Sequence, residues 1–98
     1  MHSSKARLVI TEVALAPAGD ADTRAGLLGW LAVTLNGQVQ LDGLTLRLTA
    51  NGHYALSFPA RRDRRGFDHA YIKPLDNAAR QDLERQVFAA LGVEGTVA

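Results

Sequence analysis

Two Asn-Gly pairs divide the centre of this chain into short segments in which apolar and polar residues alternate. The pair Asn36-Gly37 separates segment 27–35 from segment 38–49, and the pair Asn51-Gly52 precedes segment 54–58. Both central residues of a type I′ turn need a positive φ, which Asn and Gly tolerate better than other residues. The two pairs therefore predict two tight antiparallel hairpins, which restrict the centre of the chain to a β-meander.

The segment from Gln38 to Thr49 contains a change of phase. Its apolar residues are Val39, Leu41, Leu44, Leu46 and Leu48, so the even spacing is interrupted at Asp42-Gly43. Side chains alternate between the two faces of a strand, so all five can share one face only if a residue is inserted. We therefore predict a β-bulge at Asp42-Gly43, where the glycine allows the unusual backbone angles.

The remaining elements follow from alternation, breakers and caps. Leu8–Leu15 reads as a first strand, 17–26 as a loop rich in Pro, Gly and Asp, and Phe67–Lys73 as a fifth extended segment. A helix is expected to begin at Asp76 or Asn77, both good N-caps, and to end at Leu91 before Gly92. Its apolar stripe is Ala79, Leu83, Val87, Ala90 and Leu91. The predicted fold class is α+β, an antiparallel meander of about five strands followed by one C-terminal helix.

One helix is too narrow to cover five strands. A helix is ~10 Å wide and neighbouring strands lie ~4.8 Å apart, so the helix shields roughly two of them. We therefore expect a second copy of the chain to cover the exposed sheet, which makes the protein a homodimer.

The bulk composition is that of one small globular domain. The chain has 98 residues, of which 47% are hydrophobic and 21% charged, and we expect flexible tails at 1–7 and 93–98. It contains no cysteine, which fits a reducing compartment. Met1–Arg7 lacks the apolar core of a secretory signal, and no apolar run approaches the ~20 residues that span a bilayer. A cytoplasmic protein without membrane contact is expected.

The strongest local feature is a cluster of arginines. Four of the eleven Lys and Arg residues lie within five positions: Arg61, Arg62, Arg64 and Arg65. Guanidinium groups suit bidentate contact with phosphate, and Lys73, Arg80 and Arg85 follow at the same end of the expected fold. The sequence therefore indicates a surface for nucleic acid. A solvated loop, or a loop that docks an acidic protein, remains the alternative.

No set of residues indicates catalysis or a metal site, so we expect neither enzyme activity, cofactor, metal nor small-molecule substrate. The three histidines lack metal-ligand spacing. Asp68 and His69 are adjacent, and neighbours on a strand point to opposite faces. Most of the six aromatic residues are expected in the core, and Tyr71, close to Lys73, is the candidate for exposure and for stacking on a base.

Four blocks of sequence occur in an order and spacing that resemble those of one known family. They are ITEVAL (Ile10–Leu15), LAVTLNGQVQLDGLTLRL (Leu31–Leu48), NGHYALSFPARR (Asn51–Arg62) and KPLDNAARQDLERQVFAAL (Lys73–Leu91). On these blocks the chain resembles the SpoVG family (stage V sporulation protein G, septation regulator) of bacterial nucleic-acid-binding dimers. Their order and spacing, rather than any single block, carry the resemblance.

The resemblance implies a homodimer formed through the sheet and sequence-tolerant binding of DNA, with RNA as a second candidate. It also implies a regulatory role in septation, sporulation or gene expression. The implied contacts with nucleic acid are the basic residues of the linker and the final helix, which are Arg61, Arg62, Arg64, Arg65, Arg80 and Arg85.

Overall fold

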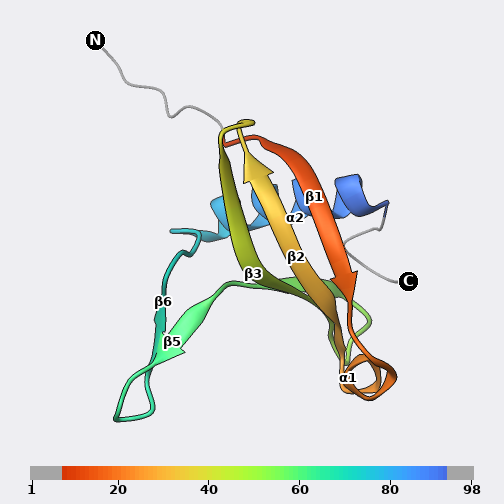
Figure 1. The fold of residues 1–98 in the computed structure, drawn as a ribbon, viewed down its shortest axis with the longest axis vertical. Coiled ribbons are helices and arrows are strands. Elements are labelled where there is room, and N and C mark those ends of the chain that lie inside the picture. The colour runs from red at the N-terminus through yellow and green to blue at the C-terminus, as the bar shows by residue number, and fades with distance from the viewer. Residues whose placement is uncertain (1–7, 93–98) are drawn as a thin grey trace.

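The computed structural model describes residues 8–92, and the tails expected at 1–7 and 93–98 lie outside the described residues. Figure 1 shows the arrangement of the elements. In chain order these are β1 (Ile10–Pro17), α1 (Asp20–Arg24), β2 (Leu27–Leu35), β3 (Val39–Leu48), β4 (Tyr54–Ser57), β5 (Ala60–Arg62), β6 (Asp68–Ala70) and α2 (Asn77–Leu91). The predicted α+β class with a C-terminal helix is confirmed. Neither helix is long and apolar enough to cross a membrane.

The main sheet has four strands rather than five. Its order is β1-β2-β3-β4, each pair antiparallel, as a meander requires. The predicted fifth strand does not join it, because β6 pairs instead with β5 in a separate two-stranded sheet. Pro59, which follows β4, has no N–H to donate to a ladder, so pairing of the main sheet stops before the basic segment.

Both predicted hairpins and the predicted bulge are present, but the tight type I′ turn is confirmed only for the first hairpin, because Asn51 does not have a positive φ. Asn36 and Gly37 have φ of 52° and 66°, the left-handed values that a type I′ turn needs. The second hairpin has a longer turn, in which Gly52 N–H donates to Thr49 O at 3.0 Å. Across the bulge, Leu31 pairs with Leu44 and Val33 with Leu41, so two residues of β3, Asp42 and Gly43, oppose one of β2. Gly43 has a φ of 81°.

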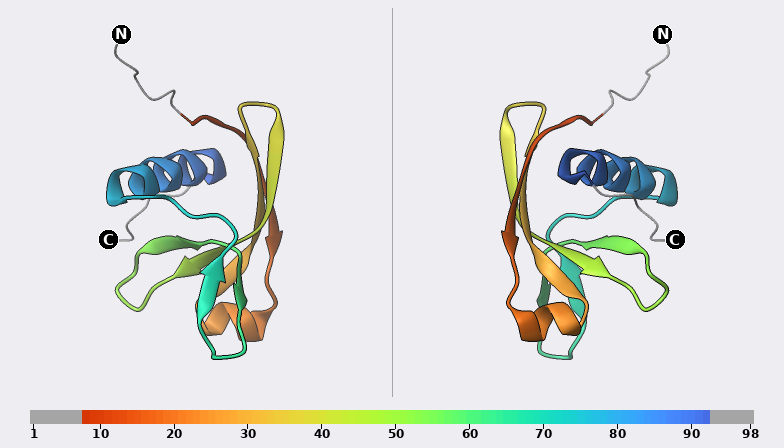
Figure 2. Two further views of the ribbon diagram at one scale, coloured as in Figure 1. Left: turned by 90° about the vertical axis from the view of Figure 1, so that its left-hand side faces the viewer. Right: turned by 90° about the vertical axis from the view of Figure 1, so that its right-hand side faces the viewer.

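The core lies between one face of the main sheet and α2, which Figure 2 shows on one side of the sheet. It consists of Leu31, Val33, Leu44, Leu46, Leu56, Val87 and Phe88. As predicted, the bulge places Leu41 on the same face as Leu44, because Leu41 packs against the cluster to which Leu44 belongs. Val39 and Leu48 lie at the ends of β3 and are exposed. Ala90, expected on the buried stripe of the helix, is also exposed.

The ends of α2 follow the sequence prediction. Asp76 is the N-cap, and its carboxylate accepts a hydrogen bond from Ala79 N at 2.8 Å. Gly92 ends the helix with a left-handed φ of 75°. The side-chain cap satisfies an N–H group that the first helical turn leaves unpaired, so it stabilises the start of α2.

Polar side chains of α2 bind both edge strands of the main sheet. Gln86 Oε1 accepts from Ile10 N on β1 at 2.8 Å. On β4, Leu56 N donates to Glu84 Oε2 at 3.1 Å, and Arg80 Nη1 donates to Leu56 O at 3.2 Å. An unpaired edge is a site for unwanted strand association, so these contacts stabilise the fold and protect both edges.

Two further differences from the sequence prediction concern β1 and the loop after it. A bulge between Ile10 and Glu12 shifts the register of β1, so that Ile10 and Val13 both pack against the core. The loop 17–26 contains the five-residue helix α1, which buries none of its residues. A helix without an apolar face leaves no periodic signal in a sequence.

Candidate functional site

The arginine cluster forms a hairpin and not an unpaired loop. Ala60, Arg61 and Arg62 pair with residues 70, 69 and 68, and the chain reverses through a β-turn from Asp63 to Gly66. The ladder extends to residues 59 and 71, because Tyr71 N donates to Pro59 O at 3.0 Å. We call residues 59–71 the basic hairpin.

Asp63 organises the turn of the basic hairpin. Its Oδ1 accepts from Arg65 N at 2.8 Å and from Phe67 N at 3.0 Å, and its Oδ2 lies 2.7 Å from Nε2 of His69. The hydrogen bond with His69, followed by the one from Phe67 N, holds the pKa of the Asp63 carboxyl below its ordinary value. Gly66 closes the turn with a φ of 87°, and its N–H donates to Asp63 O at 3.1 Å. The turn is therefore built by one carboxylate and one glycine.

The four arginines of the hairpin differ in their partners. Arg62 Nε lies 3.1 Å from Oδ1 of Asp68, directly across the ladder. Arg61, Arg64 and Arg65 are exposed, and no carboxylate of residues 8–92 pairs with them. The second aspartate of the hairpin, Asp63, contacts His69 instead. Three guanidinium groups are therefore left with their hydrogen-bond donors facing solvent.

The other predicted contact residues lie apart from this group. Arg80 is 3.7 Å from Glu84, donates to a backbone carbonyl of β4 and lies over the ring of Phe58 at 5.6 Å. Arg85 forms an ion pair with Asp82 one turn earlier on α2. Lys73 is exposed in the segment before α2, without an ion pair to any described residue. The structure thus places Arg80 in a structural role that the sequence did not reveal.

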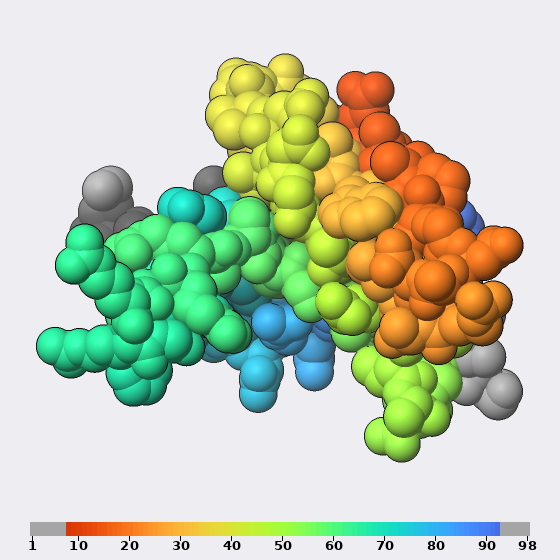
Figure 3. All heavy atoms as spheres, turned by 60° about the horizontal axis from the view of Figure 1, so that its bottom comes forward, coloured from red at the N-terminus to blue at the C-terminus, as the bar shows by residue number. Residues whose placement is uncertain are grey.

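The basic hairpin stands out from the body of the protein. In Figure 1 it extends away from the main sheet, and in Figure 3 its atoms, green to teal, form a separate lobe. All three residues of β5 and all three of β6 are exposed. A cationic lobe of this shape can approach an extended polyanion without a clash with the rest of the fold.

The aromatic residues divide into two groups. Tyr54 and Phe88 contact each other with ring centroids 6.2 Å apart, and Phe58 packs against the core cluster. Tyr71 is 69% exposed, as the sequence predicted. The expectation of core packing is wrong for Phe67, which is 63% exposed on the basic hairpin, and for Trp30, which is 43% exposed on the outer face of the main sheet.

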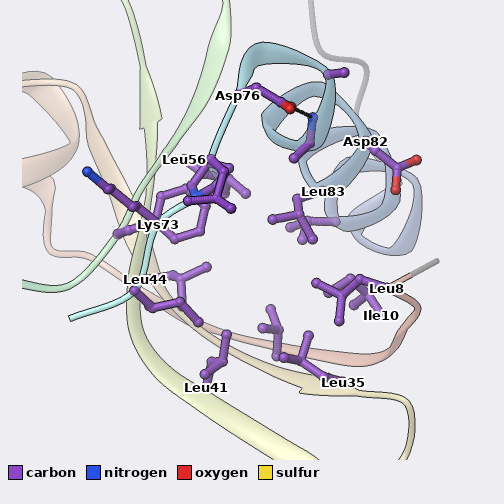
Figure 4. Close-up of a pocket in the computed structure, with 18 residues that line it drawn as sticks. Leu8, Ile10, Leu35, Leu41, Leu44, Leu56, Lys73, Asp76, Asp82 and Leu83 are labelled. Carbon is purple, nitrogen blue, oxygen red and sulfur yellow. Dashed lines mark hydrogen bonds between the residues drawn. The ribbon is translucent and has the colours of Figure 1, made fainter. Parts of the chain in front are cut away.

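An apolar cavity of about 420 Å³ lies between α2 and the main sheet. Figure 4 shows that its labelled lining is largely aliphatic and that the amine of Lys73 points away from it. Residues from both layers contribute, among them Leu8, Ile10, Leu35, Leu41 and Leu83. The cavity is therefore separate from the cationic groups of the basic hairpin.

Within residues 8–92, no three histidine, cysteine or acidic side chains are grouped so that they could hold a metal ion. Asp68 and His69 point to opposite faces of the ladder, as expected, and it is Asp63 that reaches His69. The sequence carried a signal for this arrangement, because Asp at the first and Gly at the fourth position favour a type I turn.

No protein-family model matches the chain, and no curated protein does.

Proposed function

We propose that this protein is a homodimeric, non-enzymatic regulator that binds nucleic acid in the cytoplasm. The dimer, the binding of nucleic acid and the regulatory role are what its resemblance to the SpoVG family implies. The basic hairpin is the binding element. The observation that carries the proposal is the group formed by Arg61, Arg64 and Arg65, three exposed guanidiniums on one projecting hairpin without a carboxylate partner among residues 8–92. Guanidinium donors of this kind bind phosphate oxygens in bidentate fashion.

Sequence-tolerant recognition is the mode that this arrangement supports. Arginines at the tip of a narrow hairpin can reach phosphates on the outside of a nucleic acid, and contacts to phosphate carry no sequence information. Arg62 adds positive charge on the hairpin beside its ion pair with Asp68, and Lys73 follows the hairpin in the chain, whereas Arg85 is paired with Asp82 on α2 and the contacts of Arg80 hold α2 to β4. DNA is the first candidate and RNA the second.

The proposed homodimer forms through the outer face of the main sheet. Among the described elements none covers this face, and Trp30 is exposed on it between Ala16 and Thr45, its neighbours in the ladder. A large ring flanked by small side chains is a favourable centre for an interface with a second copy. Light scattering should give twice the mass of one 10.5 kDa chain, and Trp30→Arg should halve it. A wild-type mass of a single chain at micromolar concentration would overturn this part of the proposal.

Binding itself is tested with fluorescence anisotropy on labelled duplexes of two unrelated sequences. At low salt, about 50 mM, we expect wild-type protein to bind both with closely similar affinity, because phosphate contacts do not distinguish bases. Loss of binding in the triple variant Arg61→Gln, Arg64→Gln, Arg65→Gln would assign it to the hairpin. An unchanged anisotropy with wild-type protein at this salt concentration would remove the proposal.

A second candidate function is a module that docks an acidic protein through the same hairpin. It is favoured by the exposed rings of Phe67 and Tyr71 beside the arginines, since aromatic and arginine side chains are enriched at the centres of protein interfaces. A partner retained after nuclease treatment, and released by the same triple substitution, would favour docking over nucleic acid.

A further inference from the structure

The basic hairpin has two chemically different faces. Directly paired residues of an antiparallel ladder share a face, and alternate residues of one strand do so as well. His69 pairs with Arg61, and the ladder bonds Asp63 N to Phe67 O at 2.9 Å and Tyr71 N to Pro59 O extend this alternation in both directions. Phe67, His69 and Tyr71 therefore lie on the same face. We call this the ring face.

The ring face is open to solvent. Phe67 and Tyr71 are each more than half exposed, and His69 between them keeps about half of its side chain accessible, 48%, while Asp63 fixes its ring. Arg61 is on the same face, across the ladder from His69. The opposite face has no ring, because it carries two alanines and the Arg62–Asp68 ion pair.

We propose that the ring face binds single-stranded nucleic acid, with unpaired bases stacked on Phe67 and Tyr71 and neighbouring phosphates held by Arg61 and the arginines of the turn. The inference rests on the proposed function and names its substrate class. Aromatic rings interleaved with cationic side chains are the two components with which proteins bind single strands without sequence preference.

A duplex cannot use the ring face, because its base faces are covered by the bases above and below. A strand rises about 3.4 Å per residue, so Phe67 and Tyr71, four residues apart, are about 13.6 Å apart with His69 between them. Nucleotides along one strand of a duplex are about 3.4 Å apart, so only an unpaired strand drawn out to about 6.8 Å per nucleotide can place every second base on these two rings. Every base has a flat face, so the contact tolerates any sequence and is shared by DNA and RNA.

The charge on the hairpin argues against a second copy of the chain as the occupant of the ring face. Two hairpins that met through these rings would bring Arg61 of each copy, and the arginines of each turn, close together, and the carboxylate on this face, Asp63, is already bound to His69 and to N–H groups of the turn. Like charges brought together in an interface oppose association. A single-stranded nucleic acid has base faces that can stack on the rings and phosphates that can bind the arginines.

The test uses full-length protein and anisotropy with oligonucleotides of about twelve nucleotides, dT, dA and rU, each compared with a duplex of the same length. Wild-type protein should bind the single strands more tightly than the duplexes. Phe67→Leu with Tyr71→Leu keeps apolar side chains but removes the rings, and should weaken single-strand binding about tenfold or more without changing duplex binding. Tyr71→Phe, which keeps the ring, and Val39→Ala, an exposed apolar site on β3, should leave both unchanged.

Each other outcome is decisive. If the double leucine variant loses affinity equally for duplex and single strand, or loses none for either, the inference is wrong. The proposed function still stands in that case if binding depends on the arginines. Absence of binding to any oligonucleotide overturns both. If light scattering shows that the double leucine variant changes the oligomeric mass, the ring face is an interface between copies and the inference is wrong.

Discussion

The charge on the hairpin, rather than the net charge of the protein, should set the salt dependence of duplex binding. The perturbation is the pair Arg64→Gln and Arg65→Gln, which removes two guanidiniums without carboxylate partners among residues 8–92. The matched control is Arg24→Gln with Arg47→Gln, which removes the same charge from α1 and β3, elements apart from the hairpin in Figure 1. Both variants change the net charge of the protein equally.

The expected magnitude follows from the number of free arginines. Each phosphate that is neutralised contributes about −0.9 to the slope of log K against log salt concentration. With one hairpin of the proposed dimer on the duplex and Arg61, Arg64 and Arg65 engaged, the slope is about −2.7, and the variant with Arg61 alone gives about −0.9. Between 50 and 200 mM salt, affinity should therefore fall about 40-fold for wild-type protein and less than about fourfold for the variant.

Anisotropy titrations of one labelled duplex at several salt concentrations supply both slopes. The control variant should keep the wild-type slope, because neither of its arginines lies on the hairpin. If the two double variants flatten the slope equally, binding follows net charge and the assignment of the hairpin is refuted.

Three further predictions concern the fold that carries the hairpin. The pKa of Asp63 lies below its ordinary value of 3.8, chiefly because of the hydrogen bond with His69. The ionised carboxylate should therefore stabilise the hairpin fully above pH 3.8, and this stabilisation should be lost as the pH falls through the lowered pKa. An NMR titration midpoint for Asp63 at or above 3.8 would contradict this. Gly29→Ala would place a Cβ 2.6 Å from Ala16 O, so urea unfolding should show a free energy of unfolding lower by about 1–3 kcal/mol. The control Gly19→Ala, at a site with open space, should lower it by less than about 0.5 kcal/mol. Equal losses in the two variants would count against this packing. Asp76→Ala removes the cap of α2 and should cost about 1 kcal/mol in the same assay, while Asp76→Asn should cost much less; equal costs would exclude the capping role.

The sequence predicted those parts of the fold that depend on local chemistry. Asn36-Gly37, Asp42-Gly43 and Gly92 adopt the turn, bulge and helix end that were expected, since glycine at each position takes a positive φ. The cap at Asp76 follows the same logic, because its side chain replaces a missing backbone partner. In each case one or two residues determine the conformation.

The parts that the sequence did not predict depend on competition between distant partners. The segment that contains β6 has strand character, but its alternation does not say whether it pairs with the main sheet or with the arginines of β5. The turn at Asp63-Gly66 decides this by bringing the two segments together. Likewise, nothing in the spacing of α2 shows that Arg80 bonds a carbonyl of β4, since that contact joins residues 24 positions apart.

The sequence predicted which residues belong to the candidate site, but it did not predict that they form a hairpin or which of them make ion pairs. Arg61, Arg62, Arg64 and Arg65 were identified as a cluster, yet the ion pair of Arg62 and the free state of the other three within the described chain depend on the hairpin register. Phe67 was expected in the core because its segment was assigned to the main sheet. Its exposure follows directly from the separate pairing of β5 and β6.

The most direct measurement is a map of amide chemical-shift changes when ¹⁵N-labelled wild-type protein is titrated with a short oligonucleotide at low salt. If the basic hairpin holds the nucleic acid, the largest changes should fall within residues 59–71, with smaller ones near Lys73. Changes confined to α2 or to the outer face of the main sheet around Trp30 would contradict the assignment of the binding surface to the hairpin.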